Sequence, residues 1–156
     1  RFSRWLNLRP PVRIIPLNLM VKKGRHSSQE RLESFNRIWD SLKEINAPVI
    51  VEGKRDAVAL RNLGYTGNLI ELNDGKSVLS TIEKLVREYG RGSNFVILMD
   101  WDRTGEKLAK QLKDYGESCD LYPNLRVRRE LFALCSKDIS CVEELPTFVN
   151  MLKLSC

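Results

Sequence analysis

Long apolar runs are missing from this sequence of 156 residues. No run approaches the roughly 18 residues that a membrane-spanning helix needs, and no shorter apolar stretch near the start is typical of a secretory signal. We therefore expect a cytoplasmic protein that acts away from membranes. With 42% hydrophobic and 29% charged residues, the chain is expected to fold as one globular domain with a short extension.

The sequence also has little with which to bind a transition metal. His26 is its one histidine, and no C-x-x-C pair occurs among its cysteines. Zinc sites combine such residues at short spacings, so a zinc site is not expected. Reduced thiols are the usual interpretation, with one or two disulfides as the alternative. The cysteines are Cys119, Cys135, Cys141 and Cys156.

Acidic residues are absent from residues 1–25, which carry seven Lys and Arg. The whole chain has a formal net charge of +6, so its positive excess lies in this N-terminal stretch. A basic arm on a nearly neutral globule is a candidate electrostatic contact for nucleic acid. Two other interpretations stay open: Met20 is the natural start, or the stretch is an organelle-targeting leader.

After this arm, helical and strand patterns alternate along the chain. Ser27 and Glu30 have the spacing of a capping box at the start of a helix. Helices are predicted over residues 28–45, 55–63, 77–89, 103–115, 125–136 and 144–152, strands over 49–51, 69–72, 95–99 and 118–121, and a short element over 139–142. This alternation predicts an α/β protein with a mostly parallel sheet and helices on both faces. We divide the chain into a basic extension (1–26), an N-terminal helix (27–46) and an α/β domain (47–156).

Carboxylates follow two of the predicted strands. Glu52 comes after the strand at 49–51, and Asp100 and Asp102 come after the strand at 95–99. Ligands bind beyond the carboxyl ends of parallel strands, and residues i and i+2 share a face, so the two aspartates are expected to point together. Such hard oxygen ligands suit Mg²⁺ or Mn²⁺, which leaves Glu52 to bind a second cation or to act as general acid or base.

Cations follow both acidic positions, at the expected starts of two helices. They are Lys54, Arg55, Arg103 and Lys107. Helix N-termini that carry Lys or Arg favour phosphate. The sequence therefore predicts a pocket for a metal ion and a phosphodiester.

Simpler structural roles are open for two of the acidic residues. Asp102 could serve only as the N-cap of the helix that follows it, and Asp56 could only complement a helix dipole. The Glu143–Glu144 pair is better explained as a complement to another helix start.

Three arginines on the helix predicted at 125–136 have two possible roles. They could contact phosphates, but a solvated helix face explains them better. They are Arg126, Arg128 and Arg129.

Two stretches together resemble the motifs of the Toprim domain. Residues 51–60 (VEGKRDAVAL) resemble its glutamate motif, and residues 100–106 (DWDRTGE) resemble its D-x-D-x-x-G-E motif. That domain occurs in type IA topoisomerases, bacterial DNA primases, the ribonuclease that matures 5S ribosomal RNA and small stand-alone proteins, archaeal ones included. The resemblance extends from residue 47 to about residue 150.

The resemblance implies a Rossmann-like three-layer fold with a mostly parallel four-stranded sheet. It implies that Asp100 and Asp102 bind Mg²⁺, and that Glu52 donates or accepts a proton while phosphodiester bonds break or form. Asp56 matches an acidic position that several members carry after the glutamate. Nothing in this sequence matches the tyrosine-bearing domain of topoisomerases or the zinc-binding domain of primases, so we expect the stand-alone type.

Other families fit parts of the pattern less well. The D-x-D-x-T pattern at 100–104 also fits haloacid-dehalogenase-type phosphatases, but these carry it on their first strand, and two strands are predicted before it here. A receiver domain needs an acidic pair after its first strand, where this chain has Glu52 and Gly53. Two functional classes therefore remain: a metal-dependent nuclease or related enzyme acting on RNA or DNA, and a module that positions nucleic acid for a partner. A protein partner could complete the site in either case.

Overall fold

The computed structural model describes residues 27–72 and 77–156. The basic arm expected over residues 1–26, with its role in nucleic-acid binding, lies outside the described residues. None of the helices in the described part is both long and apolar enough to cross a bilayer.

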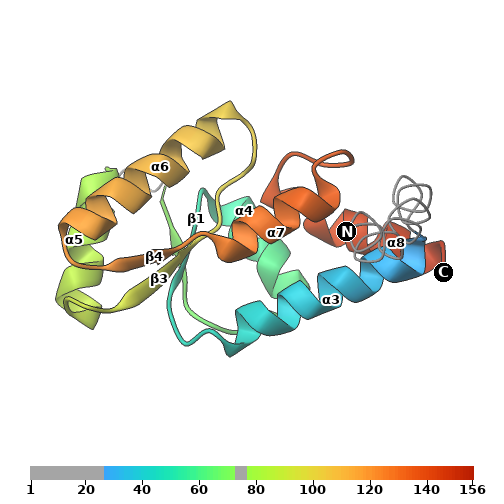
Figure 1. The fold of residues 1–156 in the computed structure, drawn as a ribbon, viewed down its shortest axis with the longest axis horizontal. Coiled ribbons are helices and arrows are strands. Elements are labelled where there is room, and N and C mark those ends of the chain that lie inside the picture. Colours follow the sequence, from blue (N-terminus) through green and yellow to red (C-terminus); the bar gives the residue numbers. More distant parts are fainter. Residues whose placement is uncertain (1–26, 73–76) are drawn as a thin grey trace, which may run out of the picture.

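Four parallel strands form one sheet in the order β2-β1-β3-β4. Figure 1 shows this sheet between the helices of the chain. The strands are β1 (Val49–Val51), β2 (Leu69–Glu71), β3 (Asn94–Ile97) and β4 (Tyr122–Asn124). The helices are α3 (Ser28–Glu44), α4 (Lys54–Asn62), α5 (Val78–Tyr89), α6 (Arg103–Ser118), α7 (Arg126–Cys135), the short 3-10 helix η1 (Val142–Glu144) and α8 (Leu145–Leu154). The predicted α/β architecture is confirmed, and every strand pair is parallel. Because β1 and β3 are the adjacent central strands, their carboxyl ends lie side by side.

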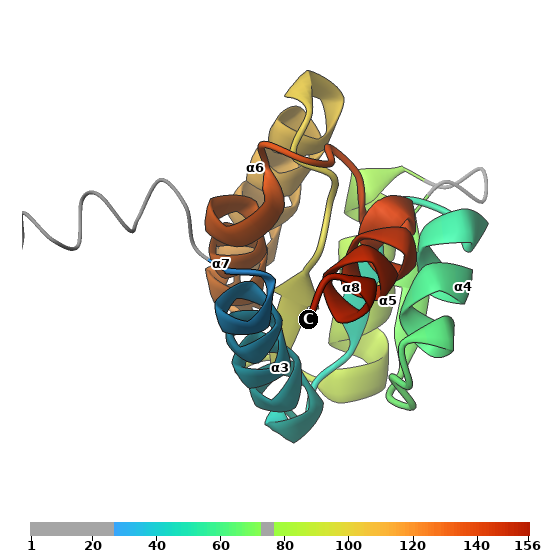
Figure 2. The ribbon, with the colours of Figure 1, turned by 90° about the vertical axis from the view of Figure 1, so that its right-hand side faces the viewer.

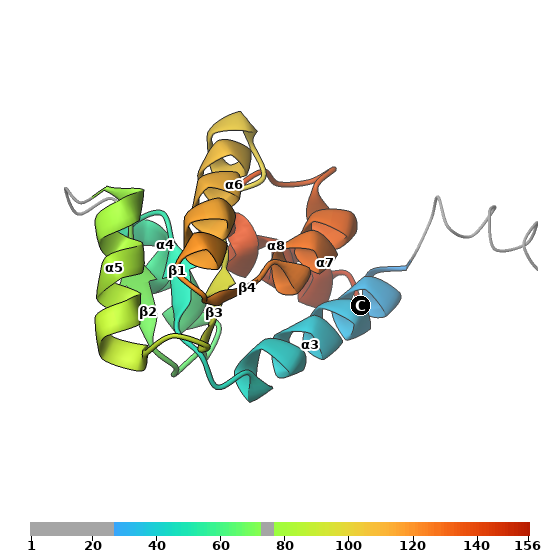
Figure 3. The same cartoon turned by 60° about the vertical axis from the view of Figure 1, so that its left-hand side comes forward.

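Helices cover both faces of the sheet, because successive strand residues point to opposite sides. Val49 and Val51 of β1 enter a core shared with α3, α4, α7 and α8. Ile50 enters the other core, which α5 and α6 complete. Figure 3 shows α5 and α6 on one side of the sheet, and Figure 2 is seen from the side of α3, α7 and α8.

The N-terminal helix α3 begins at the predicted capping box. The Ser27 hydroxyl accepts a hydrogen bond from Glu30 N–H at 3.1 Å, and the Glu30 carboxylate accepts one from Ser27 N–H at 3.0 Å. Trp39 is buried on the inner face of this helix and donates its indole N–H to the carbonyl of Leu63, after α4, at 3.0 Å. Through these contacts α3 packs in the same core as the sheet. The division of the chain at residues 26 and 46 stays a prediction.

The strand predicted over residues 118–121 is wrong, because α6 runs to Ser118 and β4 begins at Tyr122. Gly116 lets α6 continue against the sheet: a Cβ there would lie 2.6 Å from the Phe95 ring. Asp120 then reverses the chain with φ of 63°, a left-handed conformation that Asp tolerates better than most residues. Helix α6 therefore ends at Ser118, three residues beyond the end at residue 115 that the spacing of apolar residues predicts.

The edge strand β4 contains a proline. Tyr122 N–H donates to the Ser93 carbonyl at 2.9 Å, so Tyr122 points its backbone groups toward β3. Pro123, the next residue, has its backbone on the outer side of the strand, where its missing N–H costs no ladder hydrogen bond. The strand therefore tolerates a residue that would be disfavoured in the middle of the sheet.

All four cysteines are free thiols in the structure. Cys135 is buried on α7, and burial raises the pKa of its thiol to about 12. Burial also raises the pKa of the Cys141 thiol to about 12, helped by the hydrogen bond that it donates to Glu144. Both thiols are therefore protonated and weakly reactive at neutral pH.

Candidate active site

The first acidic motif lies where β1 meets α4. Glu52 is the first residue beyond the carboxyl end of β1, and Gly53 is the N-cap of α4. Asp56, which is buried, accepts a hydrogen bond from Gly53 N–H at 3.1 Å. Asp56 thereby closes the turn from which Glu52 projects, which is a firmer structural role than a complement to the helix dipole.

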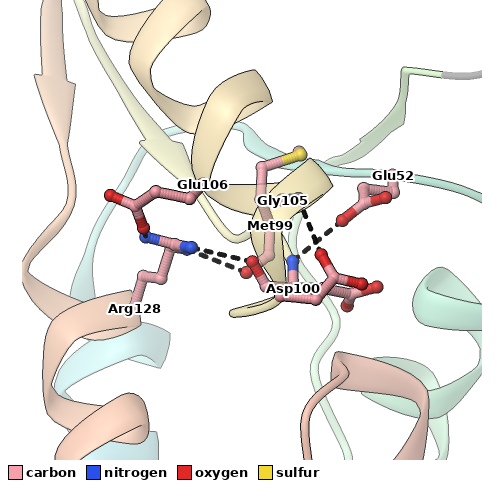
Figure 4. A network of polar contacts seen from close by, with 7 residues as sticks. Glu52, Met99, Asp100, Gly105, Glu106 and Arg128 are labelled. Atoms are coloured by element: carbon pink, nitrogen blue, oxygen red, sulfur yellow. Dashed lines mark hydrogen bonds and ion pairs between the residues drawn. The ribbon is translucent and has the colours of Figure 1, made fainter.

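The second acidic motif lies at the carboxyl end of β3 and joins the first directly. The Glu52 carboxylate accepts a hydrogen bond from Asp100 N–H at 3.0 Å (Figure 4). The Asp100 carboxylate accepts one from Val142 N–H at 2.8 Å. The Asp102 carboxylate accepts one from Gly105 N–H at 2.7 Å, so Asp102 is the N-cap of α6. The structure thus brings together the three carboxylates that the sequence singles out, and each is oriented by a backbone N–H.

Three carboxylates at the site, those of Glu52, Asp100 and Asp56, have pKa values above their ordinary range. Burial raises the pKa of Glu52 to about 7, and the charges of Asp100, Asp102 and Asp56 add to the rise, while the hydrogen bond from Asp100 N–H opposes it. Burial also raises the pKa of Asp100, with the Asp102 charge adding to it. The pKa of Asp56 rises to about 6, first through burial and then through the Asp100 charge. Clustered carboxylates of this kind are stabilised by a proton or by a cation.

The Glu143–Glu144 pair is split between two roles. The Glu143 charge helps to raise the pKa values of Asp56 and Asp100, so it adds to the negative field of the cluster. Glu144 instead accepts hydrogen bonds from Ser140 N–H at 3.2 Å and from the Cys141 thiol at 3.1 Å. The structural interpretation of this pair therefore suits Glu144 better than Glu143.

Arg128 was expected on a solvated helix face, and that expectation is wrong. It is 7% exposed, and its guanidinium donates to the carbonyls of Met99 at 3.0 Å and Asp100 at 2.7 Å and to the Glu106 carboxylate at 2.9 Å (Figure 4). The spacing of Arg128 with the buried residues Leu131 and Cys135, at i, i+3 and i+7, was the sequence signal for its burial.

The four candidate phosphate-binding cations are exposed within the first five residues of α4 and α6. They are Lys54, Arg55, Arg103 and Lys107, and none makes an ion pair within the described part of the chain. Both helices start at the carboxyl edge of the sheet, beside the acidic cluster. Lys54 and Arg55 also line a groove of about 460 Å³ between α4 and α8. These positions allow contact with the phosphates of a ligand at the cluster.

The chemistry of the carboxylate cluster fits Mg²⁺ or Mn²⁺ bound mainly through water. Among residues 27–72 and 77–156, no three His, Cys, Asp or Glu side chains are arranged to enclose a metal ion. Mg²⁺ does not need such an enclosure, because it keeps several waters and binds proteins through one or two carboxylates and substrate phosphates. Asp100 and Asp102 present two such carboxylates beyond the carboxyl end of β3, and burial together with the Asp102 charge raises the pKa of Asp100.

The metal-free protein is expected to become less stable as the pH rises. Glu52 and Asp56 have pKa values of about 7 and about 6 in the folded state, above the ordinary values of 4.5 and 3.8. Between those values the folded state binds more protons than the unfolded chain, so the free energy of unfolding falls as pH increases. From about pH 5 to about pH 8 we expect a loss of about 1–3 kcal/mol, allowing for solvent screening.

Urea titrations in the presence of EDTA measure this difference. The matched control is Glu52→Gln/Asp56→Asn protein, which cannot bind these two protons and should show a flatter dependence on pH. A wild-type protein that is more stable at about pH 8 than at about pH 5 would contradict the assignment of the raised pKa values.

Comparison with known proteins gives one matching family. Residues 47–132 match the sequence model of the family described as "Toprim domain". This match covers both acidic motifs and favours neither the phosphatase nor the receiver alternative.

Similar proteins come mainly from archaea. The chain is 40% identical over 129 residues to a UPF0292 protein of Methanosarcina barkeri, covering 81% of this chain and 87% of that protein. It is 37% identical over 125 residues to a UPF0292 protein of Pyrococcus furiosus, covering 80% and 91% of the two chains. A solved structure of a protein from Aquifex aeolicus superposes with a TM-score of 0.58 at 25% identity, covering 70% of this chain and 95% of that one.

Proposed function

The chain belongs to the Toprim domain family, whose members serve metal-dependent functions on nucleic acid, and from this premise we propose that it is a Mg²⁺-dependent nuclease acting on RNA or DNA. One observation carries the proposal: Glu52 and Asp100, from motifs 48 residues apart, are joined by a 3.0 Å hydrogen bond. A cytoplasmic location, expected from the sequence, stays a prediction.

Different residues of the chain would have different roles in phosphodiester cleavage. Asp100 and Asp102 would hold Mg²⁺, which when bound supplies Lewis acidity and lowers the pKa of a coordinated water. Glu52, held by Asp100 N–H, would take a proton from the attacking water or give one to the leaving oxygen. In the metal-free protein, burial raises the pKa of Glu52 to about 7, which is in the range that suits a general acid or base near neutral pH.

The Lys and Arg side chains near the N-termini of α4 and α6 would bind the phosphate groups. Lys54 and Arg55 on α4, and Arg103 and Lys107 on α6, are exposed beside the acidic cluster. The N-termini of both helices add partial positive charge and backbone N–H donors. These contacts would offset the repulsion between a phosphodiester and the carboxylates, and they would also serve a module that binds nucleic acid without cleaving it.

Cleavage of a labelled panel of structured RNA, single-stranded DNA and duplex DNA tests the proposal. We expect at least one substrate class to be cut in Mg²⁺ or Mn²⁺, and cutting to stop in EDTA. Asp100→Asn/Asp102→Asn protein should cut nothing, whereas Asp114→Asn/Asp120→Asn protein, changed at exposed positions on and just after α6, should cut normally.

The remaining outcomes distinguish the two functional classes. Binding of a substrate without cleavage by wild-type protein would favour the module that positions nucleic acid for a partner. Cleavage that persists in Asp100→Asn/Asp102→Asn protein would overturn the site assignment.

A further inference from the structure

The loop that carries the two aspartates leaves the sheet at a point where its carbonyls have no strand partner. β4 is paired with β3 only as far as Val96 and Asn124, after which the chain turns into α7. The carbonyls of Met99 and Asp100 therefore face α7 and not a neighbouring strand. Arg128, in the first turn of α7, donates to both of them, at 3.0 Å from Nε and 2.7 Å from Nη2 (Figure 4).

A second segment holds the same loop from the other side. Trp101 N–H donates to the Ser140 carbonyl at 3.1 Å, and the Trp101 indole N–H donates to the Ile139 carbonyl at 2.6 Å. In return, Val142 N–H donates to the Asp100 carboxylate at 2.8 Å. Residues 139–142 thus make three hydrogen bonds with two consecutive residues of the loop.

The hydrogen bonds converge on Asp100 from three elements. Its N–H is bound by Glu52 after β1, its carbonyl by Arg128 on α7, and its carboxylate by Val142 at the start of η1. One carboxylate oxygen is thereby fixed by a backbone donor, which sets the direction of the other. Such outer hydrogen bonds hold metal-binding carboxylates in the orientation that a cation requires.

We propose that Arg128 and residues 139–142 are positioning elements of the candidate metal site, acting through Asp100 and touching neither the cation nor the substrate. This inference rests on the proposed function, because it assumes that Asp100 binds a cation. Residues 139–142 lie beyond the stretch 47–132 that matches the family. The site of this protein therefore extends into a segment that the family match does not include.

Glu106 has a place in the same arrangement. Its carboxylate pairs with Arg128 at 2.9 Å, and its side chain is 74% exposed while that of Arg128 is 9% exposed. The glutamate of the D-x-D-x-x-G-E motif therefore directs its charge to the guanidinium. It supports the positioning residue, and a role as a metal ligand does not follow from its contacts.

Binding of Mn²⁺, followed by electron paramagnetic resonance, tests the role of Arg128. Arg128→Met should weaken Mn²⁺ binding about 10- to 100-fold. Arg128→Lys should recover part of the loss, because a single ammonium group can bind only some of the three acceptors that the guanidinium binds. Arg91→Met is the matched control: Arg91 also donates to a carbonyl, that of Cys119, and pairs with a carboxylate, that of Asp120, but it precedes β3 and so lies at the opposite end of that strand from the site. It should bind Mn²⁺ like wild type.

Hydrogen exchange of the metal-free protein tests the role of residues 139–142. Trp101→Phe removes the indole donor to Ile139 and should speed exchange of the Val142 amide while weakening Mn²⁺ binding by a smaller factor than Arg128→Met. Trp39→Phe removes the equivalent indole bond to Leu63 in the core. It should leave exchange at Val142 and Mn²⁺ binding unchanged.

The outcomes separate this inference from the proposed function. If wild type fails to bind Mn²⁺, or Asp100→Asn/Asp102→Asn protein binds it equally well, the proposed metal site is wrong. If wild type binds and that double variant does not, unchanged binding in Arg128→Met and Trp101→Phe proteins overturns the positioning role alone. If Arg128→Met does not fold, the comparison of Trp101→Phe with Trp39→Phe decides the question.

Discussion

Replacing Glu52 with Gln is expected to lower the rate of metal-dependent cleavage by about 10²- to 10⁴-fold, the range for loss of a general acid or base. The amide oxygen of Gln can still accept the hydrogen bond from Asp100 N–H, which Glu52 accepts at 3.0 Å. The geometry of the cluster should therefore be kept, while transfer of a proton is lost. Mn²⁺ binding should change little, because Asp100 and Asp102 are the proposed ligands.

Stability should move in the opposite direction to activity. Burial and neighbouring negative charges raise the pKa of Glu52 to about 7, so its ionised form is disfavoured at higher pH and the neutral amide is not. In EDTA at about pH 8, the free energy of unfolding of Glu52→Gln protein should exceed that of wild type by about 1 kcal/mol. A gain in stability together with a loss of activity is typical of a functional residue whose charged form the fold disfavours.

Glu71→Gln is the matched control for this prediction. Glu71 ends β2, the strand next to β1, and pairs in register with Val51, the residue before Glu52. The same chemical change one strand away should leave both cleavage and the free energy of unfolding close to wild type. A fully active Glu52→Gln protein would show that the proton is handled elsewhere.

Replacing Gly105 with Ala is expected to destroy the candidate site. A Cβ at this position would lie 1.9 Å from the carbonyl oxygen of Asp100. Because that atom belongs to the backbone, it cannot turn aside as a side chain would, and either the start of α6 or the loop must move. The movement would disturb the 2.7 Å bond from Gly105 N–H to Asp102 and the 2.7 Å bond from Arg128 to Asp100.

The expected losses concern both stability and metal binding. Ala in a helix is otherwise preferred to Gly by about 1 kcal/mol, so a net loss must come from the clash. We expect the free energy of unfolding to fall by about 3 kcal/mol, with Mn²⁺ binding weakened more than about 100-fold. Urea unfolding and Mn²⁺ titration measure the two effects separately.

Gly116→Ala is the control that distinguishes an effect on the site from the effect of a steric clash elsewhere on α6. A Cβ at Gly116 would lie 2.6 Å from the Phe95 ring, a side chain in the core at the other end of α6. We expect this variant to lose about 1–3 kcal/mol of stability and to keep its affinity for Mn²⁺. Equal Mn²⁺ affinity in Gly105→Ala and wild-type proteins would mean that the loop is not part of a metal site.

Much of the fold could be read from local patterns, and the errors have particular causes. The strand at Val49–Val51 is predicted with its exact bounds, because three β-branched residues between Pro48 and Gly53 permit little else. Tyr122–Asn124 is missed, because a strand containing proline is acceptable only at an edge, and the order of strands is not visible in the sequence. The start of β4 at Tyr122 therefore depends on the position of this strand at the edge of the sheet, which is a tertiary property.

The candidate site was accessible from the sequence only in part. Glu52, Asp100 and Asp102 could be found because strand ends and short spacings are local signals. The contacts of Arg128 and Val142 with the aspartate loop link positions 28 and 42 residues apart from Asp100. No local sequence rule pairs residues so far apart. Val142 also acts through its backbone N–H, so its side-chain type does not reveal the contact.

The proline of β4 has a consequence for how molecules of this protein meet one another. An open sheet edge normally offers N–H donors that can capture the edge of another molecule. Pro123 removes the outward donor from the middle of β4, between two residues whose backbone groups are turned toward β3. Growth of one continuous sheet across copies is therefore disfavoured on this side. At high concentration, aggregation that begins at this edge should be resisted.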